Sequence, residues 1–231
     1  VRSGTTWTQE AKLLPSDRAV NDYIGNYVVI SSDGSRVCMS AEGSDPDGVT
    51  TAGAVYVFSR SGTTWTQEAK LTALDKGTVD SLGITLSMDS TATRIIAGAI
   101  NNINGAIGRS GAAYIFLRSG TTWTQEAKIT SNDPTLQEDF GRGTAIDGTG
   151  SRIAVSAPMK TVDGFSRAGA VYVFTRSGTT WTQEQKITLT VKAADDKLGY
   201  ERSISMSSDG KILLLGAYEY DLSGLTNSGA G

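Results

Sequence analysis

The stretch Arg2-Ser3-Gly4-Thr5-Thr6-Trp7-Thr8-Gln9-Glu10-Ala11-Lys12-Leu13 returns three more times, nearly unchanged, at residues 60–71, 118–129 and 176–187. All tryptophans of the chain belong to these copies and follow one another every 58 residues: Trp7, Trp65, Trp123 and Trp181. A fixed period of this length indicates one repeated supersecondary unit, in which each unit buries its apolar surface against the next. The chain is therefore interpreted as an array of similar units.

Length and composition are those of a folded protein rich in turns. The chain has 231 residues, of which 39% are hydrophobic and 19% charged, and it contains 27 glycines. A net charge of −3 provides no general attraction for nucleic acid or for an anionic membrane, and no apolar run is long enough to cross a bilayer. We therefore expect no nucleic-acid partner and no direct membrane insertion.

Two residue types limit the chemistry. The chain contains no histidine, so the usual general base and the commonest zinc ligand are missing. Its single cysteine, Cys38, lies in the apolar run Val37-Cys38-Met39 and is interpreted as a small core residue. Together they give no support to a His-dependent catalytic triad, and they exclude an intramolecular disulfide.

Each unit contains four short extended segments, here called A to D, at the spacing of antiparallel all-β structure. Segment A follows a glycine that recurs every 58 residues and mixes polar with apolar residues, as in 84–88 and 143–146. A tight turn, which contains Asp-Gly in three of the units, separates segment A from segment B. The recurring glycines, which we interpret as structural, are Gly25, Gly83, Gly141 and Gly199.

Segments B and C are apolar at successive positions, so both faces of these strands are expected to be buried. Segment B covers 37–41, 95–99, 153–157 and 212–217, and segment C covers 54–58, 112–116 and 170–174. Segment D is the tryptophan strand, in which alternation predicts that Trp65 points one way and Glu68 and Lys70 the other. We expect the four indoles to be wedged between sheets at the outer edge of the fold.

Four antiparallel strands that grade from a partly polar A, through buried B and C, to an exposed D are typical of the blades of a β-propeller. The sequence thus predicts an all-β propeller of four-stranded blades, with about four 58-residue repeats visible. Residues 1–13 are predicted to be the outer strand of a neighbouring blade and residues 188–231 an incomplete blade. The blades between them are predicted at 14–71, 72–129 and 130–187.

The third unit carries a motif that resembles the FG-GAP repeat. Phe140-Gly141 is followed by Ser156-Ala157-Pro158 and then by Gly169-Ala170-Val171-Tyr172-Val173-Phe174, whereas the other units replace Phe-Gly by Ile-Gly or Leu-Gly. FG-GAP repeats form the blades of the integrin alpha-chain N-terminal propeller and of many bacterial, algal and phage-associated surface proteins. Such propellers commonly have about seven blades, so the resemblance implies a longer array, with a closed four-bladed ring as the alternative.

The resemblance implies a non-enzymatic binding or adhesion module that lies outside the cell, or on a cell or virion surface. Such a module mediates protein or glycan contacts or assembles into an appendage. The alternative is a propeller-type hydrolase or lyase with a carboxylate site near the axis. Its candidate carboxylates recur three residues ahead of each repeated glycine, and recurrence favours a structural cap over a unique catalytic pair: Asp22, Asp80, Glu138 and Asp196. We therefore predict no catalytic residues.

In the FG-GAP family, the turn between segments A and B often carries a calcium loop of the pattern Asp-x-Asp-x-Asp-Gly-x-x-Asp. Such a loop brings several oxygen ligands round one cation. Each corresponding turn here holds one acidic residue, which we interpret as a turn former: Asp33, Asp89, Asp147 and Asp209. Calcium is the cofactor that the family would suggest, but the turn motifs do not support it. We predict that no cofactor is required for folding.

The loops divide into two faces of opposite charge. The D–A and B–C connections contain fifteen acidic and seven basic residues, a net charge of −8, whereas the rest of the chain carries +5. We therefore predict a cationic protein segment, or a glycan, as the partner of the D–A and B–C face. Opposite charges on the two faces also suggest head-to-tail stacking into a filament. The candidate binding residues on the acidic face are Glu42, Asp45, Asp47, Asp163, Glu219 and Asp221.

Overall fold

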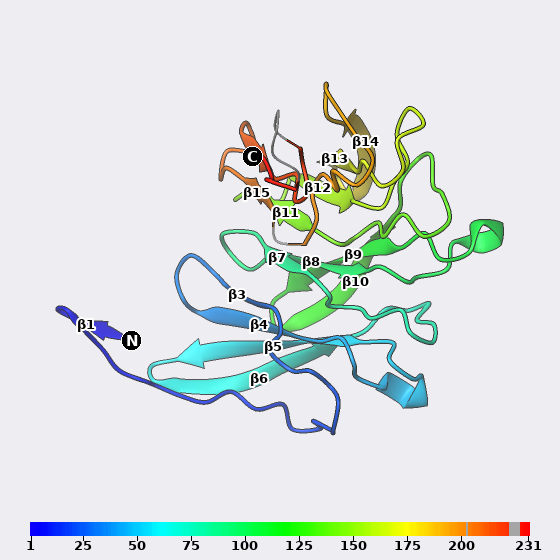
Figure 1. Cartoon of the computed structure of the whole chain (residues 1–231). Helices are drawn as coiled ribbons and strands as arrows, with labels where there is room; N and C mark the ends of the chain where they lie inside the picture. The colour runs from blue at the N-terminus through cyan, green and yellow to red at the C-terminus, as the bar shows by residue number, and fades with distance from the viewer. Residues whose placement is uncertain (202, 222–226) are drawn as a thin grey trace.

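The computed structural model describes residues 1–201, 203–221 and 227–231. It contains three four-stranded antiparallel sheets and two short two-stranded ones, and each four-stranded sheet keeps its strands in chain order (Figure 1). Among the described residues, the only helices are two 3₁₀ turns, η1 (Pro46–Gly48) and η2 (Gly105–Ile107). None of the described helices has the length and apolar character that crossing a membrane requires.

The three complete sheets are propeller blades built from segments A to D. Blade I consists of β3 (Val28–Ile30), β4 (Arg36–Ala41), β5 (Ala54–Ser61) and β6 (Thr64–Leu71). Blade II consists of β7 (Leu86–Met88), β8 (Arg94–Ala99), β9 (Ala112–Ser119) and β10 (Thr122–Ile129). Blade III consists of β11 (Thr144–Ile146), β12 (Arg152–Ala157), β13 (Ala170–Ser177) and β14 (Thr180–Ile187). Of blade IV, the described residues form β15 (Ile204–Met206) and β16 (Leu213–Leu215).

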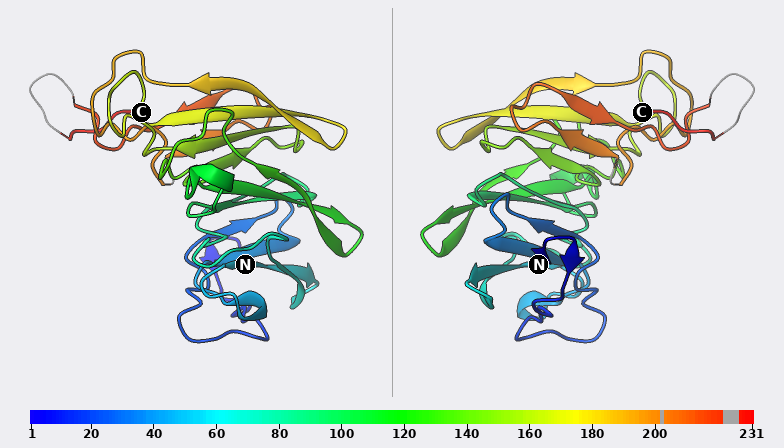
Figure 2. Two further views of the ribbon diagram at one scale, coloured as in Figure 1. Left: turned by 90° about the vertical axis from the view of Figure 1, so that its right-hand side faces the viewer. Right: turned by 90° about the vertical axis from the view of Figure 1, so that its left-hand side faces the viewer.

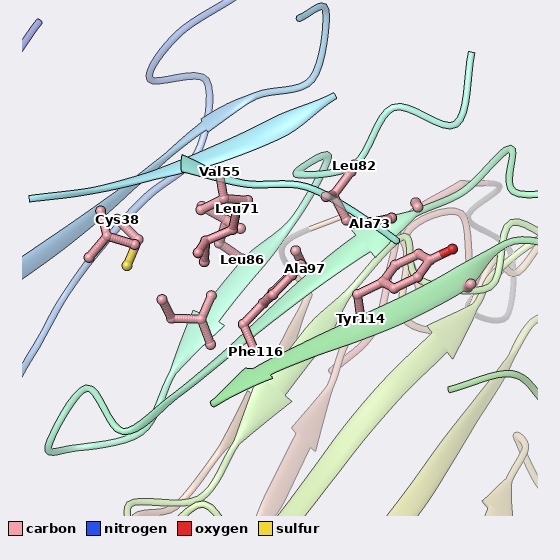
Figure 3. Packing of buried hydrophobic residues seen from close by; sticks show 13 residues of the cluster. Cys38, Val55, Leu71, Ala73, Leu82, Leu86, Ala97, Tyr114 and Phe116 are labelled. Atoms are coloured by element: carbon pink, nitrogen blue, oxygen red, sulfur yellow. The ribbon is translucent and has the colours of Figure 1, made fainter. Parts of the chain in front are cut away.

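The sheets are stacked face to face in the order of the chain (Figure 2). The hydrophobic core therefore consists of separate layers, three of them lying between consecutive sheets, and a fourth covers the other face of blade I, where Leu13 and Ile24 pack against it. Cys38, Val55 and Leu71 of blade I pack against Leu86 and Ala97 of blade II (Figure 3). Two further layers join blade II to blade III and blade III to blade IV.

Segments B and C are continuously apolar because each strand contributes to two of these layers. In β9, Tyr114 and Phe116 pack toward blade I, whereas Ala113 and Ile115 pack toward blade III. All four side chains are at most 2% exposed. Successive residues of a strand point to opposite faces, so a strand between two other sheets has no solvent-facing position.

The outer strand of each blade departs from the predicted alternation. Phe58 pairs with Gln67 and Val57 pairs with Ala69, so Glu68 is the extra residue of a β-bulge. Glu126 and Glu184 occupy the same position in β10 and β14. The bulge turns the glutamate toward the next blade, and only 5% of the Glu68 side chain is exposed. The prediction that Glu68 and Lys70 share a side was therefore wrong, because Lys70 lies over the Tyr56 ring on the other side of the sheet.

Residues 1–13 do not form the predicted outer strand. Only a hairpin of β1 (Arg2–Ser3) and β2 (Thr6–Trp7) forms there, and it lies apart from the large sheets (Figure 1). Trp7 is 75% exposed, so the expectation of a wedged indole was wrong for this copy. The physical reason is that no described segment C lies beside it to supply ladder hydrogen bonds and a second wall, as β5, β9 and β13 do for the later copies.

Candidate functional site

A repeated polar contact joins neighbouring blades at their outer strands. The indole Nε1 of Trp123 donates to Glu68 (2.7 Å), that of Trp181 donates to Glu126 (3.2 Å), and that of Trp65 donates to Glu10 (2.8 Å). The three indoles pack at the edges of the apolar layers. Each tryptophan therefore connects its own blade to the preceding repeat through an apolar ring and one hydrogen bond.

Each of these glutamates is also held by an arginine. Arg36 contacts Glu68 through Nε and Nη2, and Arg94 contacts Glu126 in the same way. Burial acts to raise the pKa of Glu68, but the hydrogen bonds from Arg36 and Trp123 outweigh it and hold the pKa below its usual value. At Glu10, the Arg60 hydrogen bond is the largest effect and the pKa falls to about 2. These residues are ionised structural groups.

The series of Trp–Glu contacts is incomplete at both ends of the described chain. Glu184 is held by Arg152 but receives no indole from the described residues, and 45% of its side chain is exposed. Trp7 likewise has no glutamate partner within the described part of the chain and stands in solvent. Complete contacts are found only where one repeat follows another.

The inner strands β3, β7, β11 and β15 line a groove of about 490 Å³ along the axis. Its lining is apolar or hydroxyl-bearing and includes Val28, Met88, Thr144 and Ser205, and no carboxylate is among its described lining residues. Thr85 and Ser87 hydrogen-bond to Thr144 across the inner strands. The hydrolase or lyase alternative needs a carboxylate pair near the axis, and nothing in this groove favours it.

The four recurring carboxylates that were considered for catalysis lie in four separate loops. Asp22, Asp80, Glu138 and Asp196 each accept a hydrogen bond from the backbone N–H three residues earlier. All four side chains are at most 5% exposed. This geometry is that of a cap that closes the D–A loop. The structure brings no two of them into a catalytic pair.

The glycine three residues after each cap lets the chain turn where two backbones nearly touch. At Gly141, φ is +98°, and an added Cβ would lie 2.4 Å from the carbonyl oxygen of Ala112. Gly25 has a similar φ of +84°, but nothing lies within 4 Å of its Cβ position. Gly83 and Gly199 are also in the left-handed region. The closest of these contacts can be made only by glycine.

The aspartates of the A–B turns are occupied by their own turns. Asp89 accepts the backbone N–H groups of Thr91, Thr93 and Arg94, and Asp147 accepts the backbone N–H and hydroxyl of Ser151. Asp33 and Asp209 each accept one serine hydroxyl and one backbone N–H. Within the described residues, no three His, Cys, Asp or Glu side chains are grouped closely enough to hold a metal ion.

All six predicted binding residues already have a partner inside the chain. Asp47 contacts Lys76 (2.9 Å), Asp163 contacts Lys192 (2.8 Å) and Glu219 contacts Lys197 (2.6 Å). Asp45 and Asp221 each accept a backbone N–H, and Glu42 accepts the amide of Asn26. Internal pairing reduces the field that the formal charges alone would suggest. The acidic face is thus a set of local sites.

One such site is a hollow of about 540 Å³ in blade I, which we call the blade I hollow. Its walls are the loop before β3 and the loop between β4 and β5, and its charged lining is Asp17, Asp22, Asp45, Asp47 and Lys70. The structure therefore brings the predicted residues Asp45 and Asp47 together with Asp22. The other predicted binding residues lie elsewhere.

Asp17 and Lys70 belong to a recurring cluster that the sequence interpretation missed. Lys70 donates to Asp17 (2.6 Å) and lies over the ring of Tyr56. Burial acts to raise the pKa of Asp17, but the hydrogen bond from Lys70 contributes to holding it below its usual value. The same cluster recurs with Asp75 and Asp133. The 58-residue spacing of these residues was a signal that could have revealed it.

Stacked four-stranded antiparallel sheets from a 58-residue repeat define a repeat protein of the β-propeller class. The sequence model of the FG-GAP repeat matches residues 7–58, 65–116 and 123–174, which together make up more than half of the chain. The chain therefore belongs to the FG-GAP repeat family.

No curated protein matches the chain. Among solved structures, TolB from Acinetobacter baumannii is similar over 86% of this chain, with 14% sequence identity and a TM-score of 0.46. The matched region covers 39% of the TolB chain.

Proposed function

We propose that this protein is a non-enzymatic interaction module that binds a basic segment of a partner protein. The binding surface is formed by the D–A and B–C loops of blade I, here called the loop face of blade I. FG-GAP membership supports a general protein-interaction role. The observation that carries the proposal is the blade I hollow, where four carboxylates face one lysine. A concave surface with an excess of carboxylates attracts cations and gives them several acceptors at once.

The place of action that we propose is outside the cell, or on a cell or virion surface, where FG-GAP proteins typically act. In that setting, adhesion would take the form of contact between the loop face of blade I and a basic loop or tail. Labelling of intact cells or particles with an impermeant amine reagent tests the location. Labelling that appears only after lysis would contradict it.

The proposed binding is tested with a lysine- and arginine-rich peptide and two matched variants. Asp47→Asn removes a carboxylate at the blade I hollow, whereas Asp163→Asn removes its equivalent in blade III. Each aspartate forms one ion pair with a lysine, so both variants lose one equivalent ion pair and should change stability by a similar amount. We expect Asp47→Asn to weaken peptide binding severalfold and Asp163→Asn to leave it nearly unchanged.

Salt provides the second arm of this test. Attraction between exposed charges is screened within about 8–10 Å at physiological ionic strength, so peptide affinity should fall as salt rises. Equal affinity for both variants and the wild type, or affinity that ignores salt, would show that this face is not the binding surface.

A further inference from the structure

Three equivalent positions in the B–C loops hold very different side chains. Ser44, Asn102 and Lys160 are 58 residues apart. Their backbone N–H groups donate to Ala41, Ala99 and Ala157, and their carbonyls accept from Gly53, Gly111 and Gly169. Each of the three residues is at most 3% exposed. The backbone at this position is thus the same in the three blades, and the side chain that it carries differs.

In blade III, this position supplies a buried ammonium group. Lys160 Nζ donates to Glu138 Oε2 (2.7 Å) and to the carbonyl of Asp133, and it lies 3.5 Å from Asp133 Oδ1. The side chain of Glu138 is fully buried and that of Lys160 is 3% exposed. The D–A loop carboxylates of this fold therefore form a binding site for an ammonium group, and blade III fills it from within.

In blade II, an amide takes the same place. Asn102 Nδ2 donates to Asp80 Oδ2 at 2.8 Å, and the N–H of Gly77 donates to the same oxygen. The cap carboxylate thus receives a side-chain donor in blade II as it does in blade III.

In blade I, the corresponding donor is missing. Among the described residues, the carboxylate of Asp22 accepts only the N–H of Ala19, although Asp22 is only 5% exposed. The Ser44 side chain is too short to replace Lys160, and the space that a longer side chain would fill is part of the blade I hollow. The buried Tyr56 hydroxyl lies beside Asp17 and Lys70 but makes no hydrogen bond of normal geometry to any described residue. Its equivalents Tyr114 and Tyr172 donate to Asp75 and Asp133.

We propose that the blade I hollow binds the ammonium group of a lysine side chain from a partner protein, in the place that Lys160 occupies in blade III. Asp22 then accepts from the ammonium as Glu138 does, and Asp17 provides the neighbouring carboxylate as Asp133 does. Lys70 does not occupy this site, because its ammonium group donates to Asp17 Oδ2. Blade III shows that both lysines fit at once: Lys186 donates to Asp133 Oδ2, and Lys160 approaches Asp133 Oδ1.

Lysine is favoured over arginine because the ligand in blade III is a compact point charge on an alkyl stem. A planar guanidinium has a different shape and a fixed fork of donors. This inference rests on the proposed function, since it names the partner group that the loop face of blade I recognises.

The experiment titrates the protein with Nα-acetyl-lysine methylamide, its arginine analogue and the basic peptide, with binding measured by calorimetry or by amide chemical shifts. Ser44→Lys supplies the blade III side chain and fills the hollow from within, and Ser44→Asn supplies the blade II side chain. A thermal melt of each variant shows that the fold is retained, and Ser44→Asn remains usable if Ser44→Lys does not fold.

We expect the wild type to bind the lysine amide more tightly than the arginine amide. Both Ser44 variants should weaken lysine binding by about tenfold or more. In each variant the new side chain donates to Asp22, so the ligand ammonium loses its charge-assisted hydrogen bond to that carboxylate. No binding of the lysine amide to the wild type, or equal binding to the wild type and both variants, would overturn the inference. Equal affinity for the arginine amide would also overturn it.

The basic peptide separates the two proposals. If the peptide binds the wild type and the Ser44 variants equally, the ammonium site is wrong and the proposed function stands. If the lysine amide binds only the wild type and the peptide binds none of the three proteins, the ammonium site stands and the proposed function falls.

Discussion

The indole of Trp123 in blade II donates a 2.7 Å hydrogen bond to Glu68 of blade I, and Glu68 is at the same time held by Arg36. One carboxylate thus joins two blades, at the outer edge of an otherwise apolar layer. The contact requires the β-bulge at Glu68 and is repeated between Trp181 and Glu126. It is therefore a structural device of the array and gives a direct way to test the energetics of blade stacking.

The first prediction compares Glu68→Gln with Glu184→Gln. Glu68 is 5% exposed and serves both Arg36 and Trp123, so its neutralisation leaves a partly buried arginine without a counterion. We expect a loss of about 2–4 kcal/mol in the free energy of unfolding. Glu184 is 45% exposed and has only Arg152, so its loss should be about 0–1 kcal/mol. Urea denaturation measures both, and equal losses would show that the contact between blades contributes nothing.

The second prediction concerns the tryptophans. Truncation of Trp123 to Ala removes a ring that packs at the edge of the layer between blades I and II and should cost about 3–5 kcal/mol. Trp7→Ala should change stability by less than about 0.5 kcal/mol, because the ring is 75% exposed. The melting temperatures of the two variants test this difference. A large loss for Trp7→Ala would contradict the detached position of the N-terminal hairpin.

The third prediction compares Gly141→Ala with Gly25→Ala. At Gly141, the new methyl group would lie 2.4 Å from the Ala112 carbonyl oxygen, so overpacking is added to backbone strain. Together these effects should cost about 2–5 kcal/mol. At Gly25, only the positive φ is unfavourable and the cost should be about 1–2 kcal/mol. Chemical denaturation ranks the two variants, and the opposite order would contradict the close contact at Gly141.

The fourth prediction concerns acid. The folded-state pKa values of Glu10, Glu68 and Glu126 lie below the usual value of 4.5, and that of Glu10 is about 2. A lowered carboxylate pKa contributes stability above the unfolded-state pKa that is lost as the pH falls through the folded-state pKa. We therefore expect the free energy of unfolding to fall as the pH is lowered from about 4.5 toward about 2.

A matched variant and an opposing group refine the acid prediction. Burial raises the pKa of Asp89, so protonation of this residue acts in the opposite direction and reduces the total slope. Glu68→Gln removes one of the lowered groups and should make the pH dependence shallower than in the wild type. Denaturation at several pH values measures the slope, and an identical slope in both proteins would contradict the ionised state of Glu68.

Sequence alone determined the repeat unit, the four strands of each blade and the class of fold. These features follow from patterns in the sequence itself. They are the 58-residue period, segments that are apolar on both faces such as 112–116, and the glycine before each segment A. The cap role of Asp22 and the turn role of Asp89 could be predicted for the same reason, because their partners are within five residues.

Only the tertiary structure decided where the outer glutamates point and where a ligand fits. Alternation placed Glu68 on the same side as Lys70, but the bulge that turns it toward Trp123 depends on the pairing of β5 with β6 and on the blade that follows. The blade I hollow arises between two loops that are separate in sequence, and its ammonium-binding character emerges when Ser44 is set beside the buried Lys160 of blade III. Such contacts depend on which surfaces are stacked together, and a strand pattern read along one chain does not contain that information.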